Sequence, residues 1–134
     1  MNAYRIVGTG IDIVENERME DMLRKWEGKF KDKVFLAAEQ EYCESKAVPT
    51  MHYAGRFAVK EAVSKAFGTG IGEHIGWLDV EVKKDSSSGA PEIQLSSKAE
   101  DLLKRMNADN VLISLSHTRN YAVAHALLVL EDNS

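Results

Sequence analysis

The sequence predicts a single domain that mixes helices with strands, and three observations support this prediction. Alanines recur every fourth residue from Ala54 to Ala66, which is the spacing of one helix face. Apolar and charged residues alternate over 78–83, and a serine-rich loop separates this strand from 92–95, as in a hairpin. The run 122–130 is almost continuously apolar, which predicts a strand buried on both faces, either centrally or in an interface.

The first element is a predicted strand over 5–14. Ile11 and Ile13 share one face of this strand, and Asp12 points to the other. A carboxylate is costly to bury there unless it is paired or binds a metal. The alternative is a turn or helix-capping aspartate at the strand end, and the pattern alone leaves both interpretations open.

Helices are expected to follow this strand. The first covers 15–26, because its apolar residues have helical spacing (Met19, Met22, Leu23, Trp26). A charged connection over 29–33 and a short helix over 37–45 come next. Pro49 marks the entry to the central helix, and Thr50 is its expected cap.

The last third of the chain predicts one helix and two strands. The pattern Ser97-x-x-Glu100 is a capping box that opens the helix. Its core residues follow at helical spacing (Ala99, Leu102, Leu103, Met106). Strands over 111–116 and 121–130 come next, joined by a turn. His125 is expected to be a packed, hydrogen-bonded histidine, whereas His117 at a strand end is a stronger functional candidate.

Length and composition indicate an ordinary cytoplasmic domain spanning residues 1–134. The net charge of -4 argues against a general nucleic-acid binder. The only cysteine, Cys43, cannot form an intramolecular disulfide, which favours a reducing compartment. The N-terminus lacks the apolar segment of a signal peptide, and no apolar run is long enough for a membrane helix.

Three glycines follow the central helix at alternate positions, Gly68, Gly70 and Gly72. One glycine is enough to end a helix, so we expect the others to leave backbone amides free to face an anion. Just before them, Glu61 and Lys65 are four residues apart. Such a pair is usually a solvated surface pair worth a few tenths of a kcal/mol, and the adjoining glycines favour a functional role instead.

Together these residues predict chemistry on a phosphate or pyrophosphate. Asp12 and Glu61 are carboxylates on separate rigid elements, and carboxylates with water and phosphate oxygens suit Mg²⁺. Cations are expected beside the glycine loop (Arg56, Lys60, Lys65). No zinc-ligand spacing is present. Ser114 and Ser116 have no nucleophile-elbow context, so no internal serine nucleophile is predicted.

Three blocks, residues 10–15, 55–72 and 114–118, resemble the signature blocks of the bacterial holo-acyl-carrier-protein synthases, the small single-domain class of 4'-phosphopantetheinyl transferases. The resemblance implies an α+β fold, with an antiparallel sheet packed on helices, that forms a homotrimer with active sites at subunit interfaces. It implies transfer of 4'-phosphopantetheine from coenzyme A to a serine of an apo acyl carrier protein, with release of 3',5'-ADP. The nucleophile then belongs to the partner.

The resemblance also implies roles for single residues. Asp12 and Glu61 match Mg²⁺ ligands, and with Lys65, near the pyrophosphate, they form the implied catalytic set. The implied coenzyme A contacts are Arg56, Ser64, Lys65, Gly68, Thr69, Gly70, Gly89, Pro91, His117 and Thr118, with Arg56 and His117 near the 3'-phosphate. Arg18 matches a carrier-contacting arginine, and neighbouring cations are expected to assist it (Arg24, Lys25). Ala90 departs from the family, where lysine is frequent, and a cationic contact from that loop is therefore in doubt.

Two other classes of function remain open at this stage. A non-catalytic module that binds coenzyme A or a nucleotide would keep the glycines and Arg56 but would not need both Asp12 and Glu61. A structural oligomer would explain the apolar run 122–130 and leave the glycine loop without a role.

Overall fold

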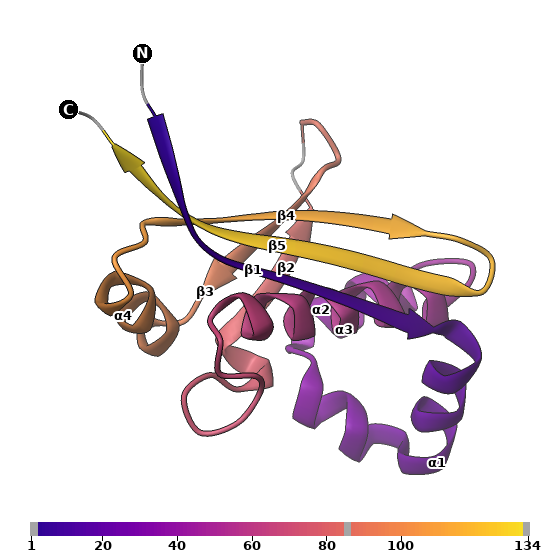
Figure 1. Cartoon of the computed structure of the whole chain (residues 1–134). Helices are drawn as coiled ribbons and strands as arrows, with labels where there is room; N and C mark the ends of the chain where they lie inside the picture. The colour runs from indigo at the N-terminus through magenta and orange to yellow at the C-terminus, as the bar shows by residue number, and fades with distance from the viewer. Residues whose placement is uncertain (1–2, 85–86, 133–134) are drawn as a thin grey trace.

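The computed structural model describes residues 3–84 and 87–132. In chain order its elements are β1 (Ala3–Glu15), α1 (Asn16–Val34), α2 (Ala37–Glu44), α3 (Pro49–Ala66), the short 3-10 helix η1 (Trp77–Asp79), β2 (Val80–Lys84), β3 (Pro91–Leu95), α4 (Ser97–Arg105), β4 (Asn110–His117) and β5 (Tyr121–Asp132). The antiparallel sheet β1-β5-β4 forms one layer, with α1, α2 and α3 on one side of it, and β2 and β3 form a separate hairpin (Figure 1). This arrangement confirms the predicted α+β fold.

Helix α3 lies directly on the sheet, and small residues make this possible. Ala58 and Ala62 of α3 are fully buried, as is Ala126 of β5. On β1, a Cβ atom added at Gly10 would lie 2.0 Å from the Ala62 carbonyl oxygen. A Cβ atom added at Gly8 would lie 2.1 Å from the Ala66 carbonyl oxygen, one turn further along α3. The strand and the helix therefore touch backbone to backbone, and only glycine fits at these two positions.

The opposite face of the sheet carries exposed apolar side chains. Ile11 and Ile13 are 62% and 61% exposed, and Leu112 of β4 is also exposed. His125 lies between Ile11 and Ser114 in the sheet register, and its Nε2 is 2.8 Å from the Thr9 hydroxyl. β5 is the central strand of the sheet, as one of the two predicted positions required, but in the single chain only one of its faces is buried. Alternate alanines of β5 pack on α3, whereas His125 lies on the opposite, exposed face of the sheet and is hydrogen-bonded to Thr9.

Helix α1 is longer than the sequence pattern suggested. The expected connection over 29–33 is wrong, because the helix continues to Val34. Phe30 and Val34 extend the apolar stripe beyond Gly28, and the Phe30 ring packs near Phe57 of α3. Trp26, in contrast, is 54% exposed, so it does not belong to the core face.

Two expected helix caps are shifted. Thr50 does not cap α3, since the helix begins at Pro49. The cap of α4 is Ser96 rather than Ser97, and its hydroxyl accepts a hydrogen bond from the Ala99 amide at 3.2 Å. The predicted capping box of Ser97 and Glu100 is therefore wrong, because the residue three positions after Ser96 is Ala99 and only the serine half of the motif is present.

Candidate active site

Three of the predicted residues come together on one side of α3. Asp12 lies near the C-terminal end of β1, Glu61 and Lys65 lie one turn apart on α3, and all three line the same pocket. Lys65 Nζ donates to Asp12 Oδ1 at 3.0 Å and to the Ile11 carbonyl at 3.2 Å. The turn or capping alternative for Asp12 is thereby wrong, because Asp12 is a strand residue paired with a lysine.

The electrostatics of this pocket suit a divalent cation. Burial raises the pKa of Glu61, the neighbouring Asp12 carboxylate raises it further, and the Lys65 ammonium opposes both effects. Three carboxylates (Asp12, Glu15, Glu61) and two cations (Arg18, Lys65) line the pocket, which leaves an excess of negative charge. Among the described residues no group of three or more His, Cys, Asp or Glu side chains could hold a metal. Two carboxylate ligands match Mg²⁺, which keeps waters and takes phosphate oxygens for the rest of its shell.

A second pocket, on another face of α3, is cationic. Arg56 is only 6% exposed, and its guanidinium carbon lies 4.1 Å from the centroid of the Tyr42 ring. Among the described residues no carboxylate forms an ion pair with Arg56, and its Nε has no hydrogen-bond partner. A buried cation without a counter-charge is costly, so this pocket is suited to receive an anion.

Two histidines join Arg56 in the cationic pocket. The rings of His52 and His117 lie 6.1 Å apart between centroids. Burial lowers the pKa of both, and the Arg56 charge lowers that of His117 further. A Cβ at Gly55 would lie 2.5 Å from the His117 ring, so glycine at this position lets the histidine approach α3.

The β2–β3 hairpin provides the remaining wall of this pocket. Gly89 and Pro91, which the resemblance implied as coenzyme A contacts, line it together with Lys83 and Lys84. Gly89 has a φ of 74°, so a side chain there would be strained. Lys84 restores a cation to a hairpin that carries Ala90 instead of lysine. Sequence reasoning missed Lys84, although two adjacent lysines at a strand end were a readable sign of a cationic site.

The two pockets have no lining residue in common. Glu61 follows Arg56 by five residues, which places the two side chains about 140° apart around the helix axis. The single chain therefore forms a carboxylate half-site from predicted residues (Asp12, Glu61, Lys65) and a cationic half-site in which His52 and Lys84 join the predicted Arg56 and His117.

The glycine loop does not present the free amides that were expected. Gly68 N donates to Lys65 O at 2.9 Å, Gly70 N to Ser64 O at 3.1 Å, and Gly72 N to Ile75 O at 2.9 Å. Gly68 and Gly70 have φ values of 81° and 65°, so they close the end of α3 in the left-handed region. The exposed Thr69 between them donates its hydroxyl to the Gly70 carbonyl at 2.9 Å.

Three other expected residues have structural contacts. Ser64 is fully buried, and its hydroxyl donates to the Glu61 carbonyl at 2.7 Å. Lys60 is fully buried as well, so it is not a cation beside the loop. Thr118 lies in the β4–β5 turn, where its hydroxyl accepts from the Tyr121 amide at 2.9 Å. In the single chain, Ser64 and Lys60 offer no group to a ligand.

The predicted carrier-contacting cations lie on the exposed side of α1. Arg18 lines the carboxylate half-site, and among the described residues it forms no ion pair. Arg24 is already engaged, with Asp21 at 2.6 Å and Glu20 at 4.0 Å. Lys25 lies 5.3 Å from the centroid of the Trp26 ring. Arg18 is thus the cation best placed between the helix surface and the pocket.

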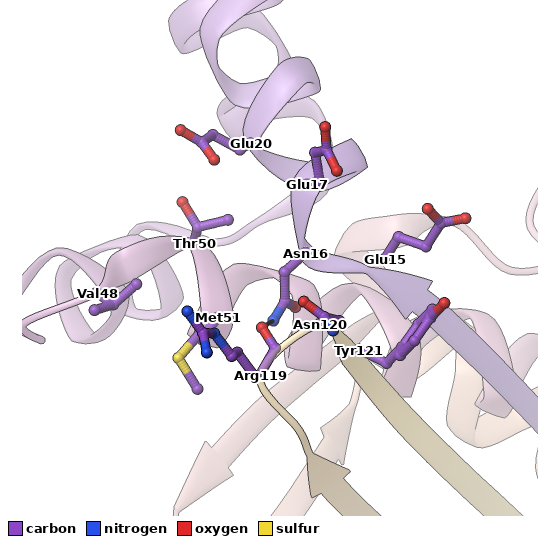
Figure 2. A pocket seen from close by; sticks show the side chains of 10 residues that line it. All are labelled: Glu15, Asn16, Glu17, Glu20, Val48, Thr50, Met51, Arg119, Asn120 and Tyr121. Atoms are coloured by element: carbon purple, nitrogen blue, oxygen red, sulfur yellow. Dashed lines mark hydrogen bonds between the residues drawn. The ribbon is translucent and has the colours of Figure 1, made fainter.

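A third hollow lies where α1 begins, beside the β4–β5 turn (Figure 2). Asn16 points into it and donates to the Arg119 carbonyl at 3.0 Å. Three carboxylates line it (Glu15, Glu17, Glu20), and Arg119 is its one lining cation. None of the predicted site residues lines it. Its acidic rim disfavours phosphate, so the two half-sites are the better candidates for such a ligand.

Comparison with known proteins identifies the class to which this fold and site belong. Residues 8–126 match the model of the 4'-phosphopantetheinyl transferase superfamily. The chain belongs to this superfamily. The match spans both half-sites.

Individual relatives define the class more narrowly. A holo-[acyl-carrier-protein] synthase of Ruminiclostridium cellulolyticum is 46% identical over 92% of each chain. The crystal structure of the holo-(acyl-carrier-protein) synthase of Bacillus anthracis, in complex with CoA (3',5'-ADP), superimposes with a TM-score of 0.78 at 37% identity, covering 96% of this chain and 99% of that one. The Helicobacter pylori synthase in complex with coenzyme A gives 0.78 at 33% identity, covering 90% and 98%.

Proposed function

We propose that this protein is a holo-[acyl-carrier-protein] synthase, which transfers 4'-phosphopantetheine from coenzyme A to a serine of an apo acyl carrier protein. The observation that carries the proposal is the unpaired, buried Arg56 in the cationic half-site. Coenzyme A carries a 3'-phosphate and a pyrophosphate, and these anions would supply the missing counter-charge. The named relatives and the bound CoA in two related structures support this ligand.

In the proposed reaction the carrier serine attacks the β-phosphorus of coenzyme A. A new P–O bond forms to the serine, the bond to 3',5'-ADP breaks, and the serine proton is released. Asp12 and Glu61 would hold Mg²⁺, which supplies charge neutralisation at the pyrophosphate. Lys65 would move its ammonium from Asp12 to the leaving phosphate, because charge grows there in the transition state.

We further propose that the protein acts as a homotrimer in which neighbouring chains complete each active site. The two half-sites lie on different faces of α3, so one chain cannot present both to one ligand without rearrangement. The exposed Ile11, Ile13 and Leu112 supply an apolar sheet face for assembly.

We also propose that the protein works in the cytoplasm, since Cys43 is a buried free thiol. No helix of the described residues is long and apolar enough to cross a membrane.

The rival function is binding of coenzyme A without catalysis. Such a module gains nothing from two carboxylates beside a pyrophosphate, because Asp12 and Glu61 repel that ligand unless a cation lies between them. The carboxylate half-site therefore favours the enzyme.

The test is to incubate the protein with coenzyme A, Mg²⁺ and an apo acyl carrier protein, and to weigh the carrier by mass spectrometry. The proposal expects the carrier to gain one phosphopantetheine group, and expects chelation of Mg²⁺ to abolish the gain. Glu61→Gln should lower kcat on the order of 10²-fold, equivalent to about 3 kcal/mol of transition-state stabilisation. Coenzyme A binding without any gain in carrier mass would favour the rival.

A further inference from the structure

Glu39 of α2 and Lys60 of α3 form a buried ion pair, with Lys60 Nζ 2.8 Å from Glu39 Oε1. The two side chains are 1% and 0% exposed. Apart from the Leu36 amide, which donates to Glu39 Oε1 at 2.8 Å at the start of α2, their other polar contacts are with the backbone of residues 77–82. Lys60 Nζ donates to Trp77 O at 2.9 Å and to Val80 O at 2.8 Å, and Glu39 Oε2 accepts from Val82 N at 2.9 Å.

The contribution of such a buried ion pair to the free energy of unfolding does not by itself explain its presence. Burial lowers the pKa of Lys60, and the Glu39 carboxylate opposes this effect. Removing two charges from water costs much of what their attraction returns, so an apolar pair of similar size is often as stable. Directional hydrogen bonds to the backbone of 77–82 are what an apolar pair could not provide.

Residues 77–82 lead directly into the β2–β3 hairpin, which forms one wall of the cationic half-site. β2 begins at Val80 and continues to Lys83 and Lys84, and the hairpin then returns through Gly89 and Pro91. The opposite wall belongs to the same two helices that carry the pair. Arg56 lies one turn before Lys60 on α3, and Tyr42, which stacks on Arg56, follows Glu39 on α2.

We propose that Glu39 and Lys60 are positioning residues that fix the β2–β3 hairpin relative to Arg56, and so set the affinity of the cationic half-site for the nucleotide phosphates of coenzyme A. This inference rests on the proposed function. Neither side chain lines the cationic half-site, and both are buried. Their effect passes through the backbone of 77–82.

The main test is the double variant Glu39→Leu/Lys60→Met, which replaces the ion pair by apolar side chains and leaves no buried charge unpaired. It should fold with a lower Tm than the wild type, because the Leu36 and Val82 amides and the Trp77 and Val80 carbonyls lose their side-chain partners, so affinities are compared at a temperature where the variant is folded. The KM for coenzyme A should rise on the order of tenfold, with a matching loss of 3',5'-ADP affinity by calorimetry, while kcat changes much less. A wild-type KM and 3',5'-ADP affinity in the folded variant would overturn the proposal.

A second double variant tests the same proposal if the first does not fold. Glu39→Gln/Lys60→Met retains an amide oxygen that can accept from the Val82 amide, so its KM should lie between those of the wild type and the first variant. Tyr53→Phe is the matched control. It removes a hydrogen bond between α3 and Glu44 of α2 without reaching 77–82, and its KM should not change.

The outcomes separate this inference from the proposed function. If the wild type does not modify the carrier, the proposed function fails before any variant is compared. If the wild type is active and the double variants lose Tm and kcat at an unchanged KM, the pair is only structural and the inference is wrong. A raised KM in Tyr53→Phe equal to that of the double variants would also overturn it.

Discussion

Lys65 Nζ is hydrogen-bonded to Asp12 Oδ1 at 3.0 Å, so the cation proposed for the leaving group and a carboxylate proposed for the metal hold each other in the free protein. Lys65 is about half exposed, whereas Asp12 is largely covered. The ammonium can therefore swing away while the carboxylate stays in place. If Mg²⁺ binds, Asp12 exchanges its hydrogen bond with Lys65 for a bond to the metal. Lys65 and Mg²⁺ therefore compete for Asp12, and this competition can be measured.

Lys65→Met should lower kcat on the order of 10²-fold, because it removes a charge that stabilises the departing 3',5'-ADP. It should also tighten Mg²⁺ binding, since Asp12 and Glu61 would then repel each other without a neighbouring cation. Activity measured over a Mg²⁺ titration separates the two effects. Lys98→Met, which removes a similarly exposed lysine paired with Asp79, should change neither. If Lys65→Met needs a higher Mg²⁺ concentration than the wild type for half-maximal activity, Lys65 and Mg²⁺ do not compete for Asp12.

Mixed trimers test whether neighbouring chains share active sites. One inactive chain carries Glu61→Gln, and the other carries Arg56→Gln with His117→Asn. If each site takes its carboxylate half from one chain and its cationic half from the next, random mixing gives one intact site in about four. Co-refolded mixtures should then recover about a quarter of wild-type kcat. Activity no higher than that of the separate variants would place both halves of the site within one chain.

Coenzyme A binding should be coupled to protonation of the cationic half-site. Burial and the Arg56 charge lower the pKa of His117 in the free protein, and a bound phosphate would raise it again. A group with a higher pKa in the complex takes up a proton on binding, so affinity should increase as the pH falls from about 8 to about 6.5. Calorimetry in buffers of different ionisation enthalpy measures the uptake directly. His117→Asn should reduce it, leaving the part due to His52, and unchanged uptake would remove His117 from the phosphate contact.

Arg18→Glu should raise the KM for the carrier and leave coenzyme A affinity unchanged. Arg18 is without an ion pair among the described residues and lies at the carboxylate half-site, so it is free to meet an acidic partner. The effect should grow as salt is lowered. Arg24→Glu is the comparison, because Arg24 is already paired with Asp21 and should matter less. Equal effects of both substitutions would show that only net charge counts.

The carboxylate half-site could be predicted from the sequence because few contacts define it. Asp12 is fixed by strand alternation, and Glu61 and Lys65 are fixed by helical spacing, so their meeting required only that β1 lie beside α3. Lys60 was misjudged for the opposite reason. Its partner Glu39 lies 21 residues away on another helix, and no local pattern signals a buried ion pair.

The glycine loop shows a different limit of sequence reasoning. The alternating glycines suggested free amides, but Gly68 and Gly70 are needed for positive φ, and their amides close the helix end. Composition identifies a conformationally permissive segment without saying which carbonyls its amides will meet. The separation of the two half-sites was equally hidden, since Arg56 and Glu61 are close in sequence and diverge only around the helix.

The contact of Gly8 and Gly10 with the carbonyls of α3 has a consequence for how the carboxylate half-site responds to its ligand. Asp12 and Glu61 are carried by two backbones that touch without intervening side chains, so no rotamer change can alter the spacing of their Cα atoms. The conformational entropy that is lost in bringing the Asp12 and Glu61 carboxylates together is lost during folding, so little more is lost when a metal binds. A larger residue at Gly8 or Gly10 would therefore push β1 away from α3. The distance between Asp12 and Glu61 would change, although both carboxylates would remain chemically intact.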